Sequence, residues 1–222
     1  MRLDSSQYNA INTRVQMSVA FYHHLHLPLR YTTPKTWAER VLQDPLHLLY
    51  DHAYLERKAA TNALDLLNRW VSSSSLQQWT QTLSHLAQDE TAHLYLVTRL
   101  IAKRGGTLPR THRNPYAQAL RSHVRMGQGK YEILDRLLVS ALIEARSSER
   151  FHLLADTAQD PELQQLYRNL FASEAGHYKT FLTLAETVVA PPILEARWHD
   201  LLYLEAELIQ TQPEQPTLHS RA

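Results

Sequence analysis

Two stretches of the chain decide its fold: Asp89-Glu90-Thr91-Ala92-His93 and Ser173-Glu174-Ala175-Gly176-His177-Tyr178. Each contains a Glu-x-x-His pair inside a segment with the apolar periodicity of a long helix. Because residues three apart share one face of a helix, each pair can offer a carboxylate oxygen and an imidazole nitrogen to the same metal ion. Two such helices, together with one glutamate from each of two others, supply the ligands of a four-helix bundle that binds two iron or manganese ions.

Both pairs interrupt apolar helical faces. The two faces read Leu83-Leu86-Glu90-His93-Val97 and Leu166-Leu170-Glu174-His177-Phe181-Leu184. Burying charged groups in an apolar seam is unfavourable unless a cation compensates them. We therefore expect both pairs to face the interior of the bundle and to bind metal.

A single glutamate precedes each pair, and the number of residues between them is about that expected across a helical hairpin. Glu56 precedes Glu90 by 34 residues, and Glu144 precedes Glu174 by 30 residues. Carboxylate-rich coordination with two imidazoles and no thiolate suits iron or manganese better than copper or structural zinc. The predicted metal ligands are Glu56, Glu90, His93, Glu144, Glu174 and His177.

A third Glu-x-x-His pair, Glu149 with His152, lies close to Glu144. Its face reads Ala145-Glu149-His152-Asp156, which predicts a solvent-facing side, whereas the face of Glu144 reads Leu137-Ala141-Glu144-Ser148-Phe151. We therefore choose Glu144 over Glu149 as a metal ligand. We expect Glu149 to bond to a neighbouring arginine or to support a ligand. Asp89 and Asp51 are further candidates for such support, because metal-bound histidines usually donate their other ring N–H to a carboxylate or carbonyl.

Signals for helix starts and stops divide the chain into two helical hairpins. Asp44-Pro45 and Asp160-Pro161 each pair a capping residue with proline at the first helical position, and Gly105-Gly106 marks a helix end. Two hairpins joined by one long crossover make the ferritin-like arrangement of a four-helix bundle. The expected helices are 45–70, 76–104, 130–158 and 161–188, with a loop at 72–75, a short helix at 116–125 in the crossover and a last helix at 193–209.

The predicted fold is therefore all-α, with extra helices at the N- and C-terminal ends of the bundle. We expect the ferritin-like di-iron domain to occupy residues 35–209. Residues 1–34 are expected to form an N-terminal extension with a helix and a loop. The polar residues 210–222 are expected to form a disordered tail.

The composition narrows the classes of function. The chain has 222 residues and no cysteine, which excludes disulfides, zinc–cysteine sites, iron–sulfur clusters and cysteine nucleophiles. No segment approaches the roughly 18 uninterrupted apolar residues of a membrane helix, and the N-terminus lacks the pattern of a secretory signal. We therefore expect a cytoplasmic protein without a membrane span.

The crossover is strongly basic although the net charge is only +1. No acidic residue lies between Glu90 and Glu132, and Lys and Arg are frequent there. Such a segment can contact the phosphates of a nucleic acid, and an aromatic neighbour such as Tyr116 can stack on an exposed base. A solvated protein surface would show the same run of charge. The candidate RNA-binding residues are Lys103, Arg104, Arg110, Arg113, Arg121 and Arg125.

Four segments together resemble the bacterial tRNA hydroxylase family that acts on 2-methylthio-N6-isopentenyl-adenosine. They are 51–60 (Asp-His-Ala-Tyr-Leu-Glu-Arg-Lys-Ala-Ala), 89–93, 143–151 (Ile-Glu-Ala-Arg-Ser-Ser-Glu-Arg-Phe) and 173–178. The segment beginning at Glu144 is the most specific, and the resemblance covers about residues 35–190. It implies a non-haem di-iron monooxygenase that hydroxylates the isopentenyl group of this adenosine beside the anticodon of tRNA. It also implies two iron ions, O2 and an external reductase, since the chain shows no flavin or iron–sulfur signature.

Three other functions fit the ligand pattern. An iron-storage or peroxide-consuming ferritin-like protein would bind no RNA, and the basic crossover argues against it. A di-iron oxygenase could instead act on a small molecule or an acyl carrier. A metal-free helical interaction module would require the inward-facing carboxylates to be accidental. We expect the protein itself to be a monomer or a weak dimer, whereas an iron-storage protein would need a cage or a ferroxidase route.

Overall fold

The computed structural model describes residues 27–69 and 76–222, and every regular element within these ranges is an α-helix. The all-α class predicted from the sequence is confirmed. The helices are α2 (Lys35–Val41), α3 (Pro45–Leu66), α4 (Leu76–Lys103), α5 (Pro115–Arg121), α6 (Lys130–Thr157), α7 (Pro161–Glu186) and α8 (Pro191–Gln210).

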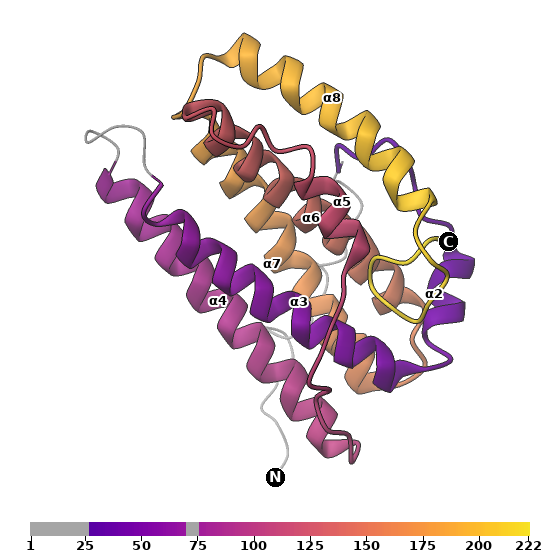
Figure 1. Ribbon diagram of the computed structural model, residues 1–222. Helices are drawn as coiled ribbons and strands as arrows, with labels where there is room; N and C mark the ends of the chain where they lie inside the picture. Colours follow the sequence, from indigo (N-terminus) through magenta and orange to yellow (C-terminus); the bar gives the residue numbers. More distant parts are fainter. Residues whose placement is uncertain (1–26, 70–75) are drawn as a thin grey trace, which may run out of the picture.

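Four long helices form the bundle that carries the site (Figure 1). Helices α3 and α4 make one antiparallel hairpin, α6 and α7 make the other, and a long crossover containing α5 joins them. Helix α8 packs against α5, α6 and α7, and α2 packs against α6. The predicted arrangement of two hairpins and one crossover is confirmed.

Local sequence signals set the starts of α3 and α7. The side chain of Asp44 accepts a hydrogen bond from the backbone N–H of His47 at 3.1 Å, and that of Asp160 accepts one from Glu162 at 2.8 Å. A proline follows each of these caps, at a helical position where no backbone N–H is needed. Both predicted helix starts are confirmed.

Helix α3 ends at Leu66, earlier than the predicted end near residue 70. The indole N–H of Trp79, near the start of α4, donates to the Leu66 carbonyl at 3.0 Å. This bond satisfies one of the carbonyls that are left without an intrahelical partner at a helix end. The predicted loop at 72–75 lies outside the described residues.

The end of α4 depends on two glycines, as predicted. Gly105 has a φ of +71°, a left-handed conformation that side chains other than glycine adopt with strain. Gly106 donates its N–H to the carbonyl of Ile101 at 3.0 Å. A Cβ atom at Gly106 would lie 2.7 Å from the hydroxyl of Tyr50, so this turn packs too closely against α3 for a larger residue.

The bundle contains two apolar cores with a buried polar layer between them. Along α4, Leu86 belongs to one core and Val97 to the other, and Glu90 and His93 lie between them. Helices α3, α6 and α7 pass from one core to the other in the same way. This layering explains why the glutamates and histidines in the sequence interrupt otherwise apolar helical faces.

The predicted disordered tail is wrong. Leu218 and Ser220 are buried, each about 1% exposed. The N–H of Leu218 donates to Asp51 at 2.7 Å, and the indole of Trp37 donates to Ser220 at 3.0 Å. Arg150 donates to the carbonyl of Leu218. The polar composition of the tail suggested disorder. In the structure, buried side chains of α2, α3 and α6 form hydrogen bonds with backbone and hydroxyl groups of the tail.

Only residues 27–34 of the predicted N-terminal extension are described, and they contain no helix. The helix that follows them, α2, was not predicted. The predicted domain boundary between residues 34 and 35 stays a prediction. Among the described residues, no helix is long and apolar enough to cross a membrane.

Candidate metal centre

The structure brings all six predicted ligands together in the buried polar layer. They form two overlapping groups of four, and within each group the candidate ligand atoms lie within 4.8 Å of one another. Glu90 and Glu174 belong to both groups, which is the geometry of carboxylates that bridge two ions. The first group is Glu56, Glu90, His93 and Glu174, and the second is Glu90, Glu144, Glu174 and His177.

Both histidines turn Nδ1 toward the carboxylates. His177 Nδ1 lies 2.7 Å from Glu90 Oε1 and 3.0 Å from Glu174 Oε2. His93 Nδ1 lies 3.1 Å from Glu174 Oε1 and 3.5 Å from Glu56 Oε2. Each group therefore combines three carboxylates with one imidazole nitrogen. The sequence could not show which ring nitrogen faces the site.

The donor set fits two divalent cations. All four glutamates are buried, so their charges are removed from water. Glu174 Oε1 and His93 Nδ1 have no hydrogen-bond partner of acceptable geometry in the described part of the chain. Two ions of charge +2 would balance four carboxylates with both imidazoles neutral, and oxygen-rich coordination of this kind suits iron or manganese. The cluster is thus suited to di-iron binding, and the role of each residue as a ligand stays a prediction.

Without metal, the carboxylates retain protons to different extents. Burial raises the pKa values of Glu56 and Glu144, and the charge of Glu174 raises them further. Burial and then the charge of Glu174 raise the pKa of Glu90 to about 8. Burial alone would also raise the pKa of Glu174, but the hydrogen bond from His177 and the close approach of His93 outweigh it and lower that pKa.

The two histidines respond to the same negative charge. Burial by itself disfavours the imidazolium form of His177, but hydrogen bonds to Glu174 and Glu90 outweigh it and raise the pKa to about 12. Burial also disfavours the imidazolium form of His93, but the nearby carboxylates of Glu174, Glu56 and Glu90 outweigh it and raise the pKa of His93. In the metal-free protein, protonated imidazoles therefore stand in for part of the missing positive charge.

Asp89, a predicted supporting residue, contacts the candidate ligand His177 from outside the cluster. Its carboxylate lies 3.3 Å from His177 Nε2, the ring nitrogen that points away from the glutamates. The same carboxylate lies 2.9 Å from the exposed His85. A carboxylate in this position fixes the orientation and tautomer of the imidazole. Asp51, the other aspartate considered, bonds instead to His112 and to the backbone of Leu218.

Sequence reasoning missed His52, which is fully buried beside Glu56. Its Nε2 atom lies 2.5 Å from Glu56 Oε1. Burial lowers the pKa of His52 to about 4, so the ring is neutral and donates a hydrogen bond to the carboxylate. His52 packs against the rings of Phe151 and Tyr167. Its position four residues before Glu56, on the same helical face, was the signal that could have revealed it.

Glu149 lies outside the cluster, in agreement with the choice of Glu144. It bonds to Arg146, and it accepts hydrogen bonds from the N–H and hydroxyl of Thr33 at 2.8 and 2.7 Å. The predicted arginine partner is therefore confirmed, but Glu149 contacts no candidate ligand. The prediction of a solvent-facing side is wrong in part, because residues around Thr33 cover Glu149 and Ala145 is fully buried.

The six basic candidates for RNA binding differ in their contacts. Lys103 lies 2.6 Å from Glu162, and Arg104 pairs with Asp160. Arg125 forms two hydrogen bonds of 2.7 and 2.8 Å with the buried carboxylate of Asp135. These three positive charges are therefore largely neutralised. Among the described residues, the other three side chains form no hydrogen bond or ion pair; they are Arg110, Arg113 and Arg121.

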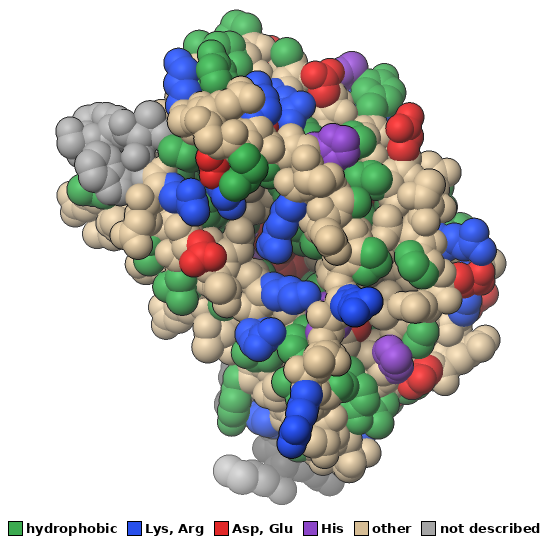
Figure 2. All heavy atoms as spheres, viewed as in Figure 1, with side chains coloured by type: hydrophobic (Ala, Val, Ile, Leu, Met, Phe, Trp, Pro, Cys, Tyr) green, Lys and Arg blue, Asp and Glu red, His purple; other side chains and the backbone are tan. Residues whose placement is uncertain are grey.

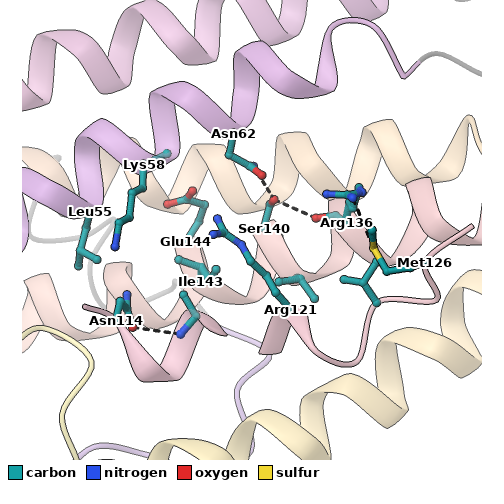
Figure 3. Close-up of a pocket in the computed structure, with 14 residues that line it drawn as sticks. Leu55, Lys58, Asn62, Asn114, Arg121, Met126, Arg136, Ser140, Ile143 and Glu144 are labelled. Atoms are coloured by element: carbon teal, nitrogen blue, oxygen red, sulfur yellow. Dashed lines mark hydrogen bonds between the residues drawn. The ribbon is translucent and has the colours of Figure 1, made fainter. Parts of the chain in front are cut away.

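A cavity extends from the basic surface to Glu144 of the candidate metal centre. It encloses about 280 Å³ between α3, α5 and α6, and Glu144 forms part of its wall (Figure 3). A second cavity of about 30 Å³ touches Glu56, Glu90, Glu144 and Glu174. The two cavities share the wall residues Leu55, Ala59, Ile143 and Glu144. Figure 2 shows a hollow near the middle of this face, with Lys and Arg side chains around it.

Comparisons with known proteins identify the relatives of this chain. A protein from Pseudomonas putida named tRNA 2-(methylsulfanyl)-N(6)-isopentenyladenosine(37) hydroxylase is 38% identical, over 85% of this chain and 89% of its own length. A protein of the same name from Salmonella typhimurium is 28% identical, over 88% of this chain and 87% of its own length.

Structural comparison agrees with the ferritin-like fold. A solved structure, Protein 43 with aldehyde deformylating oxygenase activity from Synechococcus, superimposes with a TM-score of 0.80 and 34% identity, over 89% of this chain and 98% of that one. A family model described as tRNA-(MS[2]IO[6]A)-hydroxylase (MiaE) matches residues 21–220. The chain belongs to the tRNA-(MS[2]IO[6]A)-hydroxylase family.

Proposed function

We propose that this protein is an O2-dependent di-iron monooxygenase that hydroxylates the isopentenyl group of 2-methylthio-N6-isopentenyl-adenosine in tRNA. Membership of the hydroxylase family supports the reaction class and the tRNA substrate. The observation that carries the proposal for this chain is the cavity that opens among basic side chains and ends at Glu144. A tRNA substrate also implies that the protein acts in the cytoplasm.

The cavity has the size and lining expected for one modified base. At about 280 Å³ it lies near the lower end of the range for ligand pockets, roughly 300–1,000 Å³. Its inner end is apolar, formed by Leu55, Ala59 and Ile143 beside Glu144, and this end suits the hydrocarbon isopentenyl group. Asn62 supplies a polar amide in the wall. A base in a single-stranded anticodon loop can enter such a cavity without leaving a duplex.

The overall reaction converts a C–H bond, O2, two electrons and two protons into a C–OH group and one water. Two iron ions held by the six predicted ligands would supply the capacity to activate O2. The four glutamates supply the negative charge that holds these ions, and Asp89 and His52 hold two of the ligand side chains in place. The two electrons come from an external reductase, because the chain has no flavin or iron–sulfur signature.

Wall residues of the cavity position the substrate and limit the access of water. Leu55, Ala59 and Ile143 separate the larger cavity from the small one at the cluster, and only apolar atoms of a substrate fit between them favourably. The site of oxygen insertion is therefore an apolar carbon. The polar parts of the nucleotide remain at the basic outer end of the cavity.

The tRNA backbone is proposed to contact the basic residues that have no acidic partner. Arg110, Arg113 and Arg121 meet this condition in the described ranges, whereas Lys103, Arg104 and Arg125 are paired with carboxylates. Replacing Arg110 and Arg113 together by alanine should weaken tRNA binding and reduce its dependence on salt concentration. An unchanged affinity and salt dependence would remove these residues from the proposal.

Mass spectrometry of nucleosides tests the function directly. The Fe(II)-loaded protein is incubated with tRNA carrying the methylthio-isopentenyl base, reductant and O2. We expect the modified nucleoside to gain one oxygen atom, and this gain to disappear in Glu144→Ala and His177→Ala. The matched control is Glu195→Ala, a substitution at an exposed position of α8 that should leave the gain intact.

The opposite outcome would favour another ferritin-like function. If two irons bind and O2 or peroxide is consumed rapidly but no nucleoside gains oxygen, the protein is an iron-storage or peroxide-consuming protein, or a di-iron oxygenase for a small molecule. The related Synechococcus structure with aldehyde deformylating oxygenase activity makes aldehydes the first small molecules to test.

A further inference from the structure

A chain of hydrogen bonds holds Lys58 at the wall of the cavity. Lys58 Nζ lies 2.8 Å from His112 Nδ1, and His112 Nε2 lies 2.6 Å from Asp51 Oδ1. The other oxygen of Asp51 accepts a hydrogen bond from the N–H of Leu218 at 2.7 Å. The ring of His112 also stacks on that of Tyr54, with centroids 4.9 Å apart and planes 4° from parallel. Residues from α3, the crossover and the C-terminal tail therefore fix one lysine.

The carboxylate of Asp51 determines which atoms donate and which accept in this series of hydrogen bonds. The buried carboxylate of Asp51 accepts the Nε2–H of His112, so His112 Nδ1 carries a lone pair and accepts a hydrogen bond from the ammonium group of Lys58. An ammonium group has three N–H donors, and this bond uses one of them. No carboxylate among the described residues forms an ion pair with Lys58. Two donors of Lys58 are left for a group in the cavity.

Arg121 enters the same cavity from the other side. Figure 3 shows Lys58 on α3 and Arg121 on α5 extending into the cavity with Glu144 between them. Within the described ranges, the Arg121 side chain forms no hydrogen bond or ion pair. Because both cations line one cavity, an anion bound in that cavity could accept hydrogen bonds from both of them.

The third cation of the cavity differs from these two. Arg136 also lines the cavity, but its Nε atom donates to Glu132 at 2.8 Å, and its Nη2 atom bonds to the sulfur of Met126. The charge of Arg136 is thus balanced within the protein. Lys58 and Arg121 are left as an unbalanced pair at the outer part of a cavity whose inner end is apolar.

We propose that Lys58 and Arg121 form a binding site for a backbone phosphate of the nucleotide whose base occupies the cavity. The inference rests on the proposed function, and it identifies a phosphate site that includes Lys58, a residue outside the basic crossover. Phosphate oxygens accept charge-assisted hydrogen bonds from both ammonium and guanidinium groups. Neither residue reaches the reacting carbon. His112 is a positioning residue, which acts by holding Lys58.

Calorimetric titration of the metal-loaded, full-length protein tests this site. The probes are the methylthio-isopentenyl nucleoside, its 3′,5′-bisphosphate and inorganic phosphate. In the wild type the bisphosphate should bind about 10- to 100-fold more tightly than the nucleoside, the effect of a few charge-assisted hydrogen bonds. In Lys58→Met and Arg121→Met this ratio should fall to within about threefold of one, with the affinity for the nucleoside nearly unchanged. Lys179→Met, at an exposed position of α7, is the matched control and should keep the full ratio.

The probes separate failure of the site from failure of the function. If the nucleoside binds and its phosphates add no affinity, the phosphate site is wrong and the proposed function stands. If only inorganic phosphate binds, and Lys58→Met abolishes that binding, the site stands and the nucleotide substrate is wrong. If no probe binds, or if Lys58→Met weakens the nucleoside and the bisphosphate equally, the phosphate site is overturned.

His112 provides a further test of the positioning role. His112→Ala should lower the ratio of bisphosphate to nucleoside affinity by about threefold to tenfold, because Lys58 then loses its fixed position. His112→Gln should restore much of the ratio, because its amide oxygen can accept from Lys58 while its amide nitrogen donates to Asp51. If the glutamine variant behaves like the alanine variant although both are folded, the positioning role of His112 is wrong.

Discussion

The described residues include two buried groups of charged side chains whose charges are balanced in opposite ways. The metal centre contains four glutamates and two histidines, and no arginine or lysine belongs to it. The second group, here called the arginine cluster, contains Arg146, Arg150, Glu149 and Glu205. Arg146 forms two hydrogen bonds of 2.8 Å with Glu205, and both side chains are fully buried.

The arginine cluster contains its own counter-charges. Arg146 pairs with Glu205 and Glu149, and the hydroxyl of Tyr116 donates a further hydrogen bond to Glu205 at 2.9 Å. Arg150 donates to the carbonyl of Leu218 and forms no ion pair among the described residues. The cluster joins α6 to α8 and to the residues around Thr33. The metal centre has no such internal partner for its excess of negative charge. Burial of charge alone therefore does not indicate a ligand site in this fold, whereas an unbalanced excess of carboxylates does.

The largest expected effect is on iron binding, and it should follow the loss of a glutamate that belongs to both groups of candidate ligands. Glu174 belongs to both groups of candidate ligands, so Glu174→Ala should remove both ions and abolish hydroxylation. The affinity for iron should fall by more than about 100-fold, since even residues that only support a ligand change affinity by about 10- to 100-fold. Iron content per folded chain is the measurement, with Glu195→Ala as control. Two irons retained in Glu174→Ala would contradict the assignment.

Breaking the arginine cluster should reduce stability and leave iron binding intact. Arg146→Met leaves Glu205 buried without its partner, which should cost about 3–5 kcal/mol in the free energy of unfolding. Urea unfolding measures this loss. The double variant Arg146→Met with Glu205→Leu should recover most of it, because no lone charge remains. A loss of iron from the folded Arg146→Met protein would show that the two clusters are not independent.

A smaller effect is expected from Asp89, which touches the metal centre only through His177. Asp89→Asn keeps the size of the side chain but removes the carboxylate that holds His177 Nε2. We expect the affinity for Fe(II) to fall by about tenfold, with two irons still bound at saturation. Competition with a chelator of known affinity measures the change. Equal affinities for the variant and the wild type would mean that Asp89 does not orient His177.

The smallest expected effect is a dependence of stability on pH, which should arise from the metal-free centre and not from the arginine cluster. The folded pKa of Glu90 is about 8, above its usual value of 4.5, and that of His177 is about 12, above its usual value of 6.5. Folded metal-free protein therefore binds more protons than unfolded chains between pH 6.5 and 8. Stability is lost as pH rises through this interval. Glu174, whose pKa is lowered, has its effect only at acidic pH.

Thermal unfolding in the presence of a chelator checks this prediction. The melting temperature of the metal-free protein should decrease from pH 6.5 to pH 8, and Glu90→Gln should weaken the decrease. Iron should stabilise the protein more at the higher pH, because the metal competes with protons for the same ligands. A melting temperature that is constant or rises over this interval would contradict the protonation states described for the cluster.

The sequence predicted the buried layer of glutamates and histidines because its signal is local. Glutamate and histidine three residues apart in an apolar face are visible without the structure, and so is the lone inward glutamate of each other helix. Glu144 was separated from Glu149 by the same criterion. His52 was overlooked although it lies four residues before Glu56 on the same helical face, because that spacing permits a contact between the two side chains without requiring it.

Long-range contacts explain what the sequence could not predict. The tail at residues 210–222 looked disordered because it is polar, but Asp51, Trp37 and Arg150 provide partners for it from distant parts of the chain. Likewise, the basic crossover appeared uniform in sequence. Only the structure distinguishes Arg125, which is paired with Asp135, from Arg121, which faces the cavity.

Native mass spectrometry during an anaerobic Fe(II) titration of the metal-free protein tests the central claim most directly. The excess of buried carboxylates predicts two irons per chain in the wild type, and two in the Arg146→Met protein that remains folded. It predicts none in Glu174→Ala at the same free iron concentration. A wild-type protein that binds no iron, or that loses its irons with Arg146→Met and keeps them with Glu174→Ala, would contradict the account.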